Sequence, residues 1–318
     1  MKKLIPLIYG LTWLTVGPLL GQQQPPVPAA NEQDAVITMD VSRVVLHVTV
    51  REGKARYVGD LSQGDFSIKD DGVPQEILAY SREDVPVAIG LLVDNSKSMM
   101  NKGSQVVEAA KAFVRASNKA DEMFVLHFNE KLTYGLPQTL PFTGDVKELD
   151  LALESLNLDG QTALYDAIHE GLKHLNRSKL TKKALIVISD GGDNVSFHKA
   201  SDVIKESDLS GAMFYGIGIY DPMDGDANPG VLKKLAQGTG GEAYFPQDLK
   251  EIKDLCETIA RDLRSQYSLT YSPSKSGSSG KFHKVEVKVK DPKGRKLYVR
   301  TRTGYYEPTG KNAGGSTK

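Results

Sequence analysis

The sequence has only one cysteine, Cys256, among its 318 residues. A single thiol cannot form an intrachain disulfide or a multi-cysteine zinc site, so both features are excluded. The sequence also lacks an excess of either charge, because 40 Lys and Arg residues balance 40 Asp and Glu residues. Proteins that bind nucleic acid by neutralising phosphates need a basic excess or a concentrated basic face, so the composition argues against that class.

Long apolar runs are missing except at the N-terminus. Leu4 to Leu20 carries no charge and follows the basic residues Lys2 and Lys3. The run is short for a membrane span of ~20 residues, so it predicts a secretory signal over residues 1–21. Leu19 matches the small-residue cleavage pattern poorly, which leaves an uncleaved N-terminal anchor as the alternative. We therefore predict an exported protein, periplasmic or extracellular, with no further membrane span.

The rest of the chain divides by its hydrophobic periodicity. Residues 22–34 are rich in Pro, Gln and Ala and, like the tail 308–318, are predicted to be disordered. Residues 35–86 and 267–307 alternate apolar and polar side chains, which is typical of strands with one buried face. Residues 87–266 instead alternate apolar runs with helical stripes, so this segment is predicted to be a separate domain.

The middle segment has the pattern of a doubly wound α/β domain. Val87–Val93, Ala184–Ile188 and Ala212–Ile219 are continuous apolar runs, typical of strands that are buried on both faces. Helical stripes, such as the one from Val106 to Val114, separate the runs. The alternation predicts a mainly parallel sheet with helices on both faces.

The two flanking segments predict a second, all-β unit. Val44–Val50 and His283–Lys290 alternate strictly, and Phe66–Lys69 leads into the hairpin signal Asp70-Asp71-Gly72. We expect Gln75–Tyr80 to be the return strand of this hairpin. Because each flank alone would expose an apolar face, we predict that they pair into one small antiparallel β-sandwich.

Polar residues follow the predicted buried strands. The first strand ends in Asp94-Asn95-Ser96-Lys97-Ser98, Thr162 lies just before a helix, and Asp190 follows the strand that ends at Ser189. Open sheets of this type place their ligand sites at the carboxyl ends of the strands. Hard oxygen ligands suit Mg²⁺, with Mn²⁺ or Ca²⁺ as alternatives, and argue against zinc or copper. The alternative is that Ser96, Ser98 and Thr162 merely cap helices.

The pattern Asp94-x-Ser96-x-Ser98 with Thr162 and Asp190 resembles the metal-ion-dependent adhesion site (MIDAS) of von Willebrand factor type A (VWA) domains. The resemblance implies that the hydroxyls bind the ion directly, that the aspartates act through water, and that an Asp or Glu of a partner protein fills the open position. One residue departs from the pattern: Lys97 stands where the family often has Gly, and it can extend outward or lean over the site. The predicted partner-binding rim consists of Lys97, Gln161, Asp193 and His198.

Motifs in the flanks extend the resemblance to about residues 35–307. Gly64-Asp65-Phe66, Asp71-Gly72, Arg264–Tyr271 and Arg302-Thr-Gly-Tyr resemble an exported, acidobacterial-type VWFA-related family. The implied function is binding or adhesion, without a catalytic residue. A scaffold with a vestigial metal site is one alternative. A Mg²⁺-dependent phosphoryl-transfer enzyme that uses Asp94 is another, although Ser96 stands where such an enzyme would need a second carboxylate.

Overall fold

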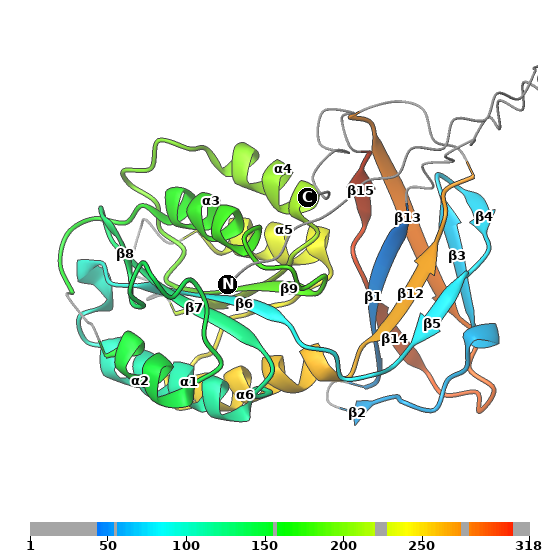
Figure 1. The fold of residues 1–318 in the computed structure, drawn as a ribbon, viewed down its shortest axis with the longest axis horizontal. Coiled ribbons are helices and arrows are strands. Elements are labelled where there is room, and N and C mark those ends of the chain that lie inside the picture. The colour runs from blue at the N-terminus through cyan, green and yellow to red at the C-terminus, as the bar shows by residue number, and fades with distance from the viewer. Residues whose placement is uncertain (1–42, 54–55, 155–157, 220–227, 275–279, 308–318) are drawn as a thin grey trace, which may run out of the picture. The chain divides into compact units, whose positions relative to one another are not determined.

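The computed structural model describes residues 43–53, 56–154, 158–219, 228–274 and 280–307. Within them the chain forms an α/β unit and two antiparallel sheets (Figure 1). The predicted signal (1–21), linker (22–34) and tail (308–318) lie outside the described residues. None of the helices in the described ranges has the length and hydrophobicity that a membrane crossing requires.

The α/β unit is built on a six-stranded sheet in the order β11-β10-β9-β6-β7-β8. The strands are β6 (Ala88–Asp94), β7 (Glu122–Phe128), β8 (Leu132–Tyr134), β9 (Lys183–Ser189), β10 (Met213–Gly218) and β11 (Ala243–Tyr244). Neighbouring strands pair in parallel, except that β8 runs antiparallel to β7. The strands β6, β7, β9 and β10 are buried almost throughout. The predicted doubly wound, mainly parallel sheet is confirmed.

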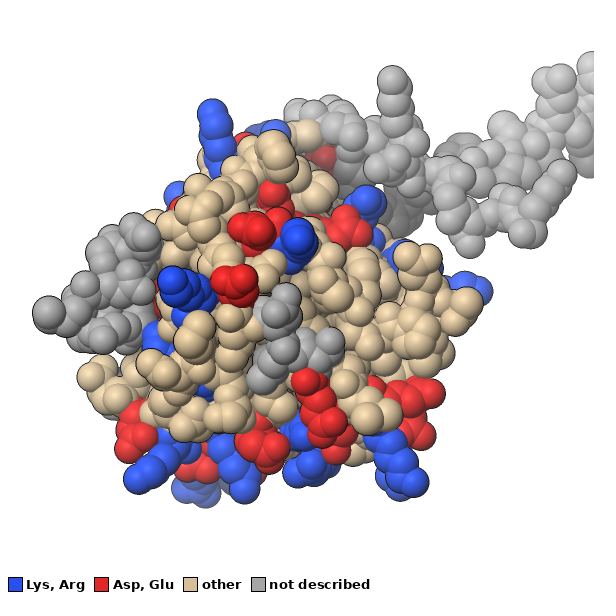
Figure 2. Space-filling model, turned by 90° about the vertical axis from the view of Figure 1, so that its left-hand side faces the viewer, with Lys and Arg blue, Asp and Glu red and all other residues tan. Residues whose placement is uncertain are grey.

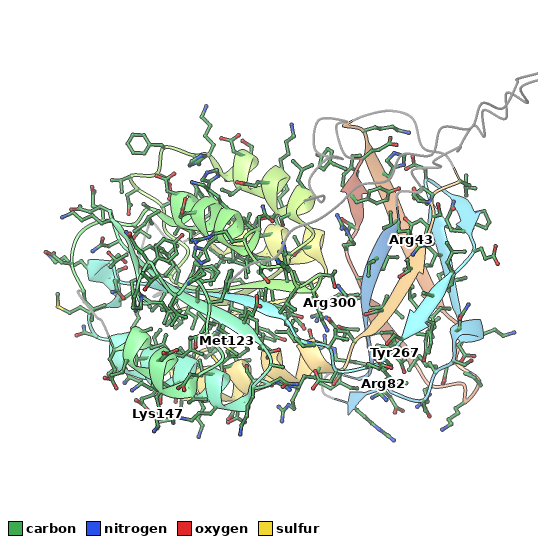
Figure 3. All side chains as sticks on the ribbon, in the orientation of Figure 1. Arg43, Arg82, Met123, Lys147, Tyr267 and Arg300 are labelled. Atoms are coloured by element: carbon green, nitrogen blue, oxygen red, sulfur yellow. The ribbon has the colours of Figure 1, made fainter. Side chains whose placement is uncertain are left out.

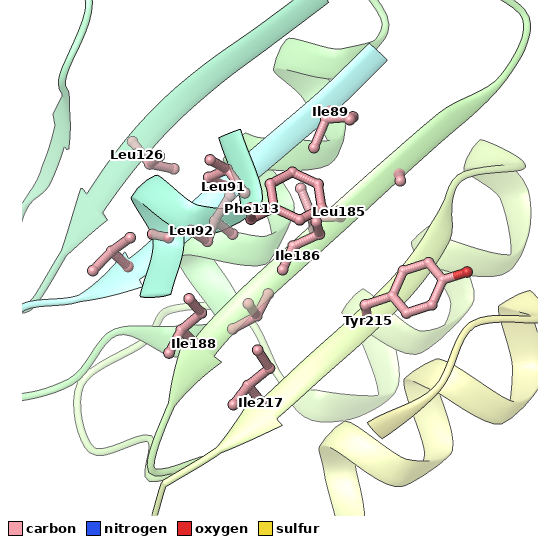
Figure 4. Packing of buried hydrophobic residues seen from close by; sticks show 14 of the residues in the cluster. Ile89, Leu91, Leu92, Phe113, Leu126, Leu185, Ile186, Ile188, Tyr215 and Ile217 are labelled. Atoms are coloured by element: carbon pink, nitrogen blue, oxygen red, sulfur yellow. The ribbon is translucent and has the colours of Figure 1, made fainter. Parts of the chain in front are cut away.

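Helices cover both faces of this sheet, with α1, α2 and α6 on one side and α3, α4 and α5 on the other (Figure 1). Their bounds are α1 (Gly103–Ala116), α2 (Val146–Leu153), α3 (Leu164–Leu175), α4 (Ala200–Ser210), α5 (Pro229–Thr239) and α6 (Glu251–Arg264). Figure 4 shows Leu91, Ile186 and Ile217 of adjacent strands in the core together with Phe113 of α1. Helix α4 has no strong hydrophobic stripe in its sequence, because its buried residues are Val203 and Ser207 and only the first is apolar.

The flanking strands form two sheets, β14-β1-β12-β5, with β2 paired to β1, and β15-β13-β3-β4. Their bounds are β1 (Val44–Glu52), β2 (Arg56–Tyr57), β3 (Phe66–Asp70), β4 (Val73–Gln75), β5 (Ala79–Ser81), β12 (Tyr267–Tyr271), β13 (Phe282–Val289), β14 (Leu297–Arg300) and β15 (Gly304–Tyr306). Both sheets mix strands from the two ends of the chain and share one buried cluster that includes Leu46, Ile68 and Tyr267. The predicted pairing of the two flanks is confirmed.

The return strand of the first hairpin differs from the prediction. The strand β4 returns only over Val73–Gln75, whereas Ala79–Ser81 pairs with β12 in the other sheet. Asp71 and Gly72 form the hairpin turn with φ of 47° and 81°, the positive values that two-residue hairpins favour. The residues after the turn, 73–81, do not alternate strictly, so their pattern does not show where the chain changes sheets.

A partly buried charge cluster joins the α/β unit to the flanking strands. Arg300 of β14 forms ion pairs with Asp262 of α6 and with Glu242, which precedes β11, and Figure 3 shows it at this junction. Asp262 is fully buried at 0 % exposure and accepts a hydrogen bond of 2.6 Å from the Tyr215 hydroxyl. Arg51 of β1 reaches Glu242 at 2.9 Å. The cluster therefore anchors α6 to the flanking sheet.

Candidate metal centre

Asp94 is the last residue of β6, and it is only 1 % exposed. Its Oδ1 accepts a hydrogen bond of 2.8 Å from the Ser96 amide, and its Oδ2 accepts one of 2.6 Å from the Ser189 hydroxyl. Ser189 ends β9, the parallel neighbour of β6, so the two side chains meet at one edge of the sheet. We did not predict a role for Ser189. Its signal is a hydroxyl at the end of an otherwise apolar strand.

The serines of the first loop connect to the second aspartate. The Ser96 Oγ lies 3.0 Å from the Ser98 Oγ, and the Ser98 hydroxyl donates a short hydrogen bond to Asp190 Oδ2. Asp190 is 3 % exposed, and its Oδ1 accepts from the Gly192 amide at 3.1 Å. The structure thus brings four of the predicted ligand residues into one group of oxygens: Asp94, Ser96, Ser98 and Asp190.

Thr162 lies at the same edge of the sheet, in a loop that is tied to both of the loops above. The Lys97 amide donates to the Gly160 carbonyl at 3.2 Å, which joins this loop to the one carrying the serines. The Asn194 amide donates to the Thr162 carbonyl at 2.9 Å, which joins it to the loop after Asp190. Thr162 is 4 % exposed. Backbone contacts, rather than its side chain, fix the position of this residue.

Helix capping does not account for these hydroxyls. Ser96 precedes a 3₁₀ helix, Lys97–Met99, but its side chain makes no capping hydrogen bond. The residue at the N-cap position of α1 is Lys102. The corresponding residue of α3 is Ala163 and not Thr162. The alternative prediction, that these residues merely cap helices, is therefore wrong for Ser96 and Thr162.

The two aspartates place uncompensated negative charge in a buried position. Burial and the nearby Asp190 carboxylate raise the pKa of Asp94 to about 6. Within the described part of the chain, no Lys, Arg or His forms an ion pair with either aspartate. A cation between them would offset both charges, and carboxylate and hydroxyl oxygens are ligands that suit Mg²⁺. The residues present therefore fit a divalent ion.

Lys97 and Gln161 of the predicted rim are exposed. Among the described residues, no hydrogen bond or ion pair holds the Lys97 ammonium group over Asp94 or Asp190. The described residues thus do not tie this lysine to either aspartate, and whether it extends outward or leans over the site stays a prediction.

The side chains of Asp193 and His198 hold their loop in place. Asp193 Oδ1 accepts hydrogen bonds from the Ser196 hydroxyl at 2.5 Å and from a backbone amide of α3 at 3.2 Å. The His198 Nδ1 lies 2.7 Å from Asp166 Oδ1, and its ring stacks on His169 with a centroid distance of 4.1 Å. These contacts fasten the loop to the first turn of α3.

Phe197 is the most exposed large apolar residue on this loop. Its side chain is 96 % exposed, while its amide donates to Asp166 Oδ2 at 3.0 Å. A single exposed aromatic ring is common on protein surfaces and does not by itself indicate a binding role. Sequence reasoning passed over it, because exposure cannot be read from a loop sequence.

Figure 2 looks onto the side of the α/β unit toward which β6 and its parallel neighbours run. Basic and acidic residues alternate along its lower border, and other residue types cover much of the centre. No single sign of charge dominates this face. Recognition here would therefore depend on local contacts rather than on long-range attraction.

The sequence model of the von Willebrand factor type A domain matches residues 88–258, which is more than half of the chain. The chain belongs to the VWA family. The predicted resemblance to VWA domains is thus confirmed, whereas the finer likeness to an exported acidobacterial family stays a prediction. None of the curated proteins compared with the chain matches it.

Solved VWA structures share the fold at low sequence identity. A von Willebrand factor type A protein from Catenulispora acidiphila is 16 % identical with a TM-score of 0.51, covering 77 % of this chain and 74 % of its own. Proximal thread matrix protein 1 from the mussel byssus, solved with a zinc-occupied MIDAS motif, is 18 % identical with a TM-score of 0.51. The match covers 62 % of this chain and 50 % of the mussel protein. An aerotolerance-related membrane protein from Bacteroides fragilis is 19 % identical with a TM-score of 0.46. The match covers 56 % of this chain and 98 % of the Bacteroides protein. The two likenesses with a TM-score of 0.51 show the fold alone.

Proposed function

We propose that this VWA protein is an exported, non-enzymatic binding module that recognises an Asp or Glu of a partner protein through a divalent cation. Mg²⁺ is the proposed ion, with Mn²⁺ or Ca²⁺ as alternatives. The observation that carries the proposal is a pair of buried carboxylates, Asp94 at 1 % exposure and Asp190 at 3 %. Among the described residues, neither carboxylate forms an ion pair with a Lys, Arg or His side chain. The proposed ligand set is Asp94, Ser96, Ser98, Thr162 and Asp190.

The hydrogen bonds of the site are arranged for such an ion. A hydroxyl can donate its proton to a carboxylate and still offer a lone pair to a cation. The Ser98 hydroxyl donates to Asp190 and therefore accepts from the Ser96 hydroxyl, which leaves one of its lone pairs for an ion. The Ser189 hydroxyl and the Ser96 amide hold the Asp94 carboxylate in one orientation. The ion, when bound, would supply an electrophilic position for one further oxygen ligand.

A fold relative supports a metal at this edge of the sheet. The mussel byssus protein was solved with zinc in its MIDAS motif. Its site and the one proposed here lie in the same type of domain. The residues favour a binding role over catalysis. Ser96 stands where a phosphoryl-transfer enzyme would need a second carboxylate beside Asp94.

Calorimetric titration of chelated protein with Mg²⁺, Mn²⁺ and Ca²⁺ tests the ion. We expect about one ion per chain for the wild type and none for Asp94→Ala. Glu76→Ala is the matched control, because it removes an exposed carboxylate from the connection between β4 and β5, outside the α/β unit. If the wild type binds no ion, Lys97→Gly tests whether the lysine competes with it. Continued lack of binding would refute the metal site and favour the scaffold alternative.

Partner recognition needs a separate test. Immobilised peptides with a central Asp or Glu, each with a matched Asn or Gln control, can be probed with the ion-loaded protein. We expect retention of the acidic peptides only, lost with EDTA and in Asp94→Ala. Equal retention of the amide peptides, or retention that survives EDTA, would contradict recognition through the ion.

A further inference from the structure

A second group of metal-ligating side chains lies in the flanking sheet β15-β13-β3-β4. Asp70 ends β3, Asp71 begins the hairpin turn, and His283 lies on β13, the antiparallel partner of β3. One ligand atom from each residue lies within 4.8 Å of the other two. Asp70 and His283 are each only 5 % exposed, and Asp71 is exposed. None of these residues takes part in the site at Asp94.

The spacing of the three ligand atoms matches shared coordination better than hydrogen bonding. The His283 Nδ1 lies 3.4 Å from Asp70 Oδ1 and 3.4 Å from Asp71 Oδ2. An N–H···O hydrogen bond spans ~2.7–3.2 Å, which is shorter. Two ligands at ~2.0–2.1 Å from one tetrahedral zinc ion lie ~3.3–3.4 Å apart. Both contacts of the imidazole have this value.

Each carboxylate directs one oxygen at the imidazole, and its other oxygen accepts hydrogen bonds from the protein. The Asp71 oxygen that faces the imidazole also accepts one of 3.1 Å from Lys281 Nζ. Asp70 Oδ2 accepts hydrogen bonds of 2.8 Å from the hydroxyls of Tyr271 and Tyr305. Asp71 Oδ1 accepts one of 2.9 Å from the Lys284 amide. Such bonds commonly orient carboxylates that bind a metal with their second oxygen.

The far side of the imidazole supports the same interpretation. The His283 side chain is 7 % exposed, and its Nε2 has no hydrogen-bond partner among the described residues. The carboxylate of Glu307 lies 3.6 Å from this nitrogen. Metal-binding histidines usually direct their second ring N–H toward a carboxylate or a carbonyl group. An ion at Nδ1 would offset the charges of the two aspartates and leave Nε2 facing Glu307.

We propose that Asp70, Asp71 and His283 form a second divalent-cation site, selective for zinc or a similar imidazole-binding ion. The imidazole ligand distinguishes it from the all-oxygen site at Asp94, which suits Mg²⁺. Lys281 lies 3.1 Å from Asp71 Oδ2, and its half-exposed ammonium group must move when an ion binds. The ion would join the β3–β4 turn to β13, two elements that come from opposite flanks of the α/β unit.

Zinc titration in a background without the first site tests this proposal. Asp94→Ala supplies this background because it removes a buried carboxylate of the first site. Variants at His283 and Asp71 then report on the second site, so the result does not depend on the proposed function. We expect this background to bind about one Zn²⁺ per chain. When Co²⁺ is added in place of Zn²⁺, the protein should show the absorption bands of tetrahedral Co²⁺. His283→Gln and Asp71→Asn should each weaken Zn²⁺ binding at least about tenfold. Lys281→Ala should strengthen it.

Two features keep the test interpretable. Asn tolerates positive φ and retains the oxygen that accepts from Lys284, so Asp71→Asn should leave the hairpin folded. Glu286→Gln, on the exposed side of β13, is the matched control and should leave Zn²⁺ affinity unchanged. A folded background that binds no Zn²⁺ would overturn the proposal. So would Zn²⁺ binding that Asp71→Asn and His283→Gln both leave intact.

Discussion

Replacing Asp94 with asparagine should separate what this carboxylate costs the fold from what it contributes to ion binding. In the metal-free protein, burial and the Asp190 charge raise the pKa of Asp94 from 3.8 to about 6. At ~1.36 kcal/mol per pKa unit, that rise favours the neutral carboxyl by about 3 kcal/mol. The stabilisation from protonation is complete below the unfolded pKa of 3.8 and is lost as the pH rises through about 6.

The wild type without metal should therefore lose up to ~3 kcal/mol of unfolding free energy from this group between ~pH 4 and ~pH 8. The asparagine variant stays neutral, so it should lack this dependence and unfold at a higher urea concentration than the wild type at ~pH 8 in EDTA. Asparagine can still accept from the Ser96 amide and donate to the Ser189 oxygen. The substitution should thus leave no buried polar atom unpaired.

Adding Mg²⁺ should reverse the order of stability. At ~100 times the Kd, ion binding adds ~2.7 kcal/mol to the wild type, and the variant should gain nothing. Urea unfolding with and without Mg²⁺ at both pH values measures these effects, with exposed Glu76→Gln as a control that should change neither. A variant that is less stable than the wild type in EDTA at ~pH 8 would refute the reasoning, because Asp94 would then not be a buried, uncompensated charge.

Three further predictions concern other buried groups. Ser189→Ala should weaken Mg²⁺ binding about tenfold, measured by calorimetry, because Asp94 Oδ2 loses its donor; an unchanged affinity would show that this hydroxyl does not orient the carboxylate. Asp262→Ala should lower the unfolding free energy by about 2 kcal/mol, since it removes a fully buried acceptor of the Tyr215 hydroxyl and one of the two partners of the half-buried Arg300, whereas exposed Asp254→Ala on the same helix should cost less than ~0.5 kcal/mol. Cys256 is 1 % exposed, and burial raises the pKa of its thiol to about 12, so a thiol reagent should react at ~pH 8 only as urea unfolds the protein; rapid reaction of the native protein would contradict this burial.

The α/β unit and its polar edge could be predicted from the sequence for a physical reason. Strands that are buried on both faces must be apolar throughout, so β6, β9 and β10 appear as continuous runs. In a parallel sheet all carboxyl ends lie at one edge, so residues that directly follow such runs must come close together. Asp94, Ser96, Ser98 and Asp190 could be identified in this way.

Short elements could not be identified, because too few residues carry their pattern. The strands β8, β11 and β15 each span only two or three residues. The residues around the change of sheet between β4 and β5 carry no clear alternation, and the weakly amphipathic α4 has little apolar surface to reveal it.

Only the tertiary structure decided which distant residues meet. Ser189 reaches Asp94 because β9 lies beside β6, and Arg300 meets Asp262 because β14 packs near α6. His283 meets Asp70 and Asp71 because β13 pairs with β3, although these strands come from opposite ends of the chain. Periodicity reports which face of an element is buried, since that depends on neighbours in sequence. Which elements then become neighbours depends on how their buried faces pack together, and that is a property of the whole fold.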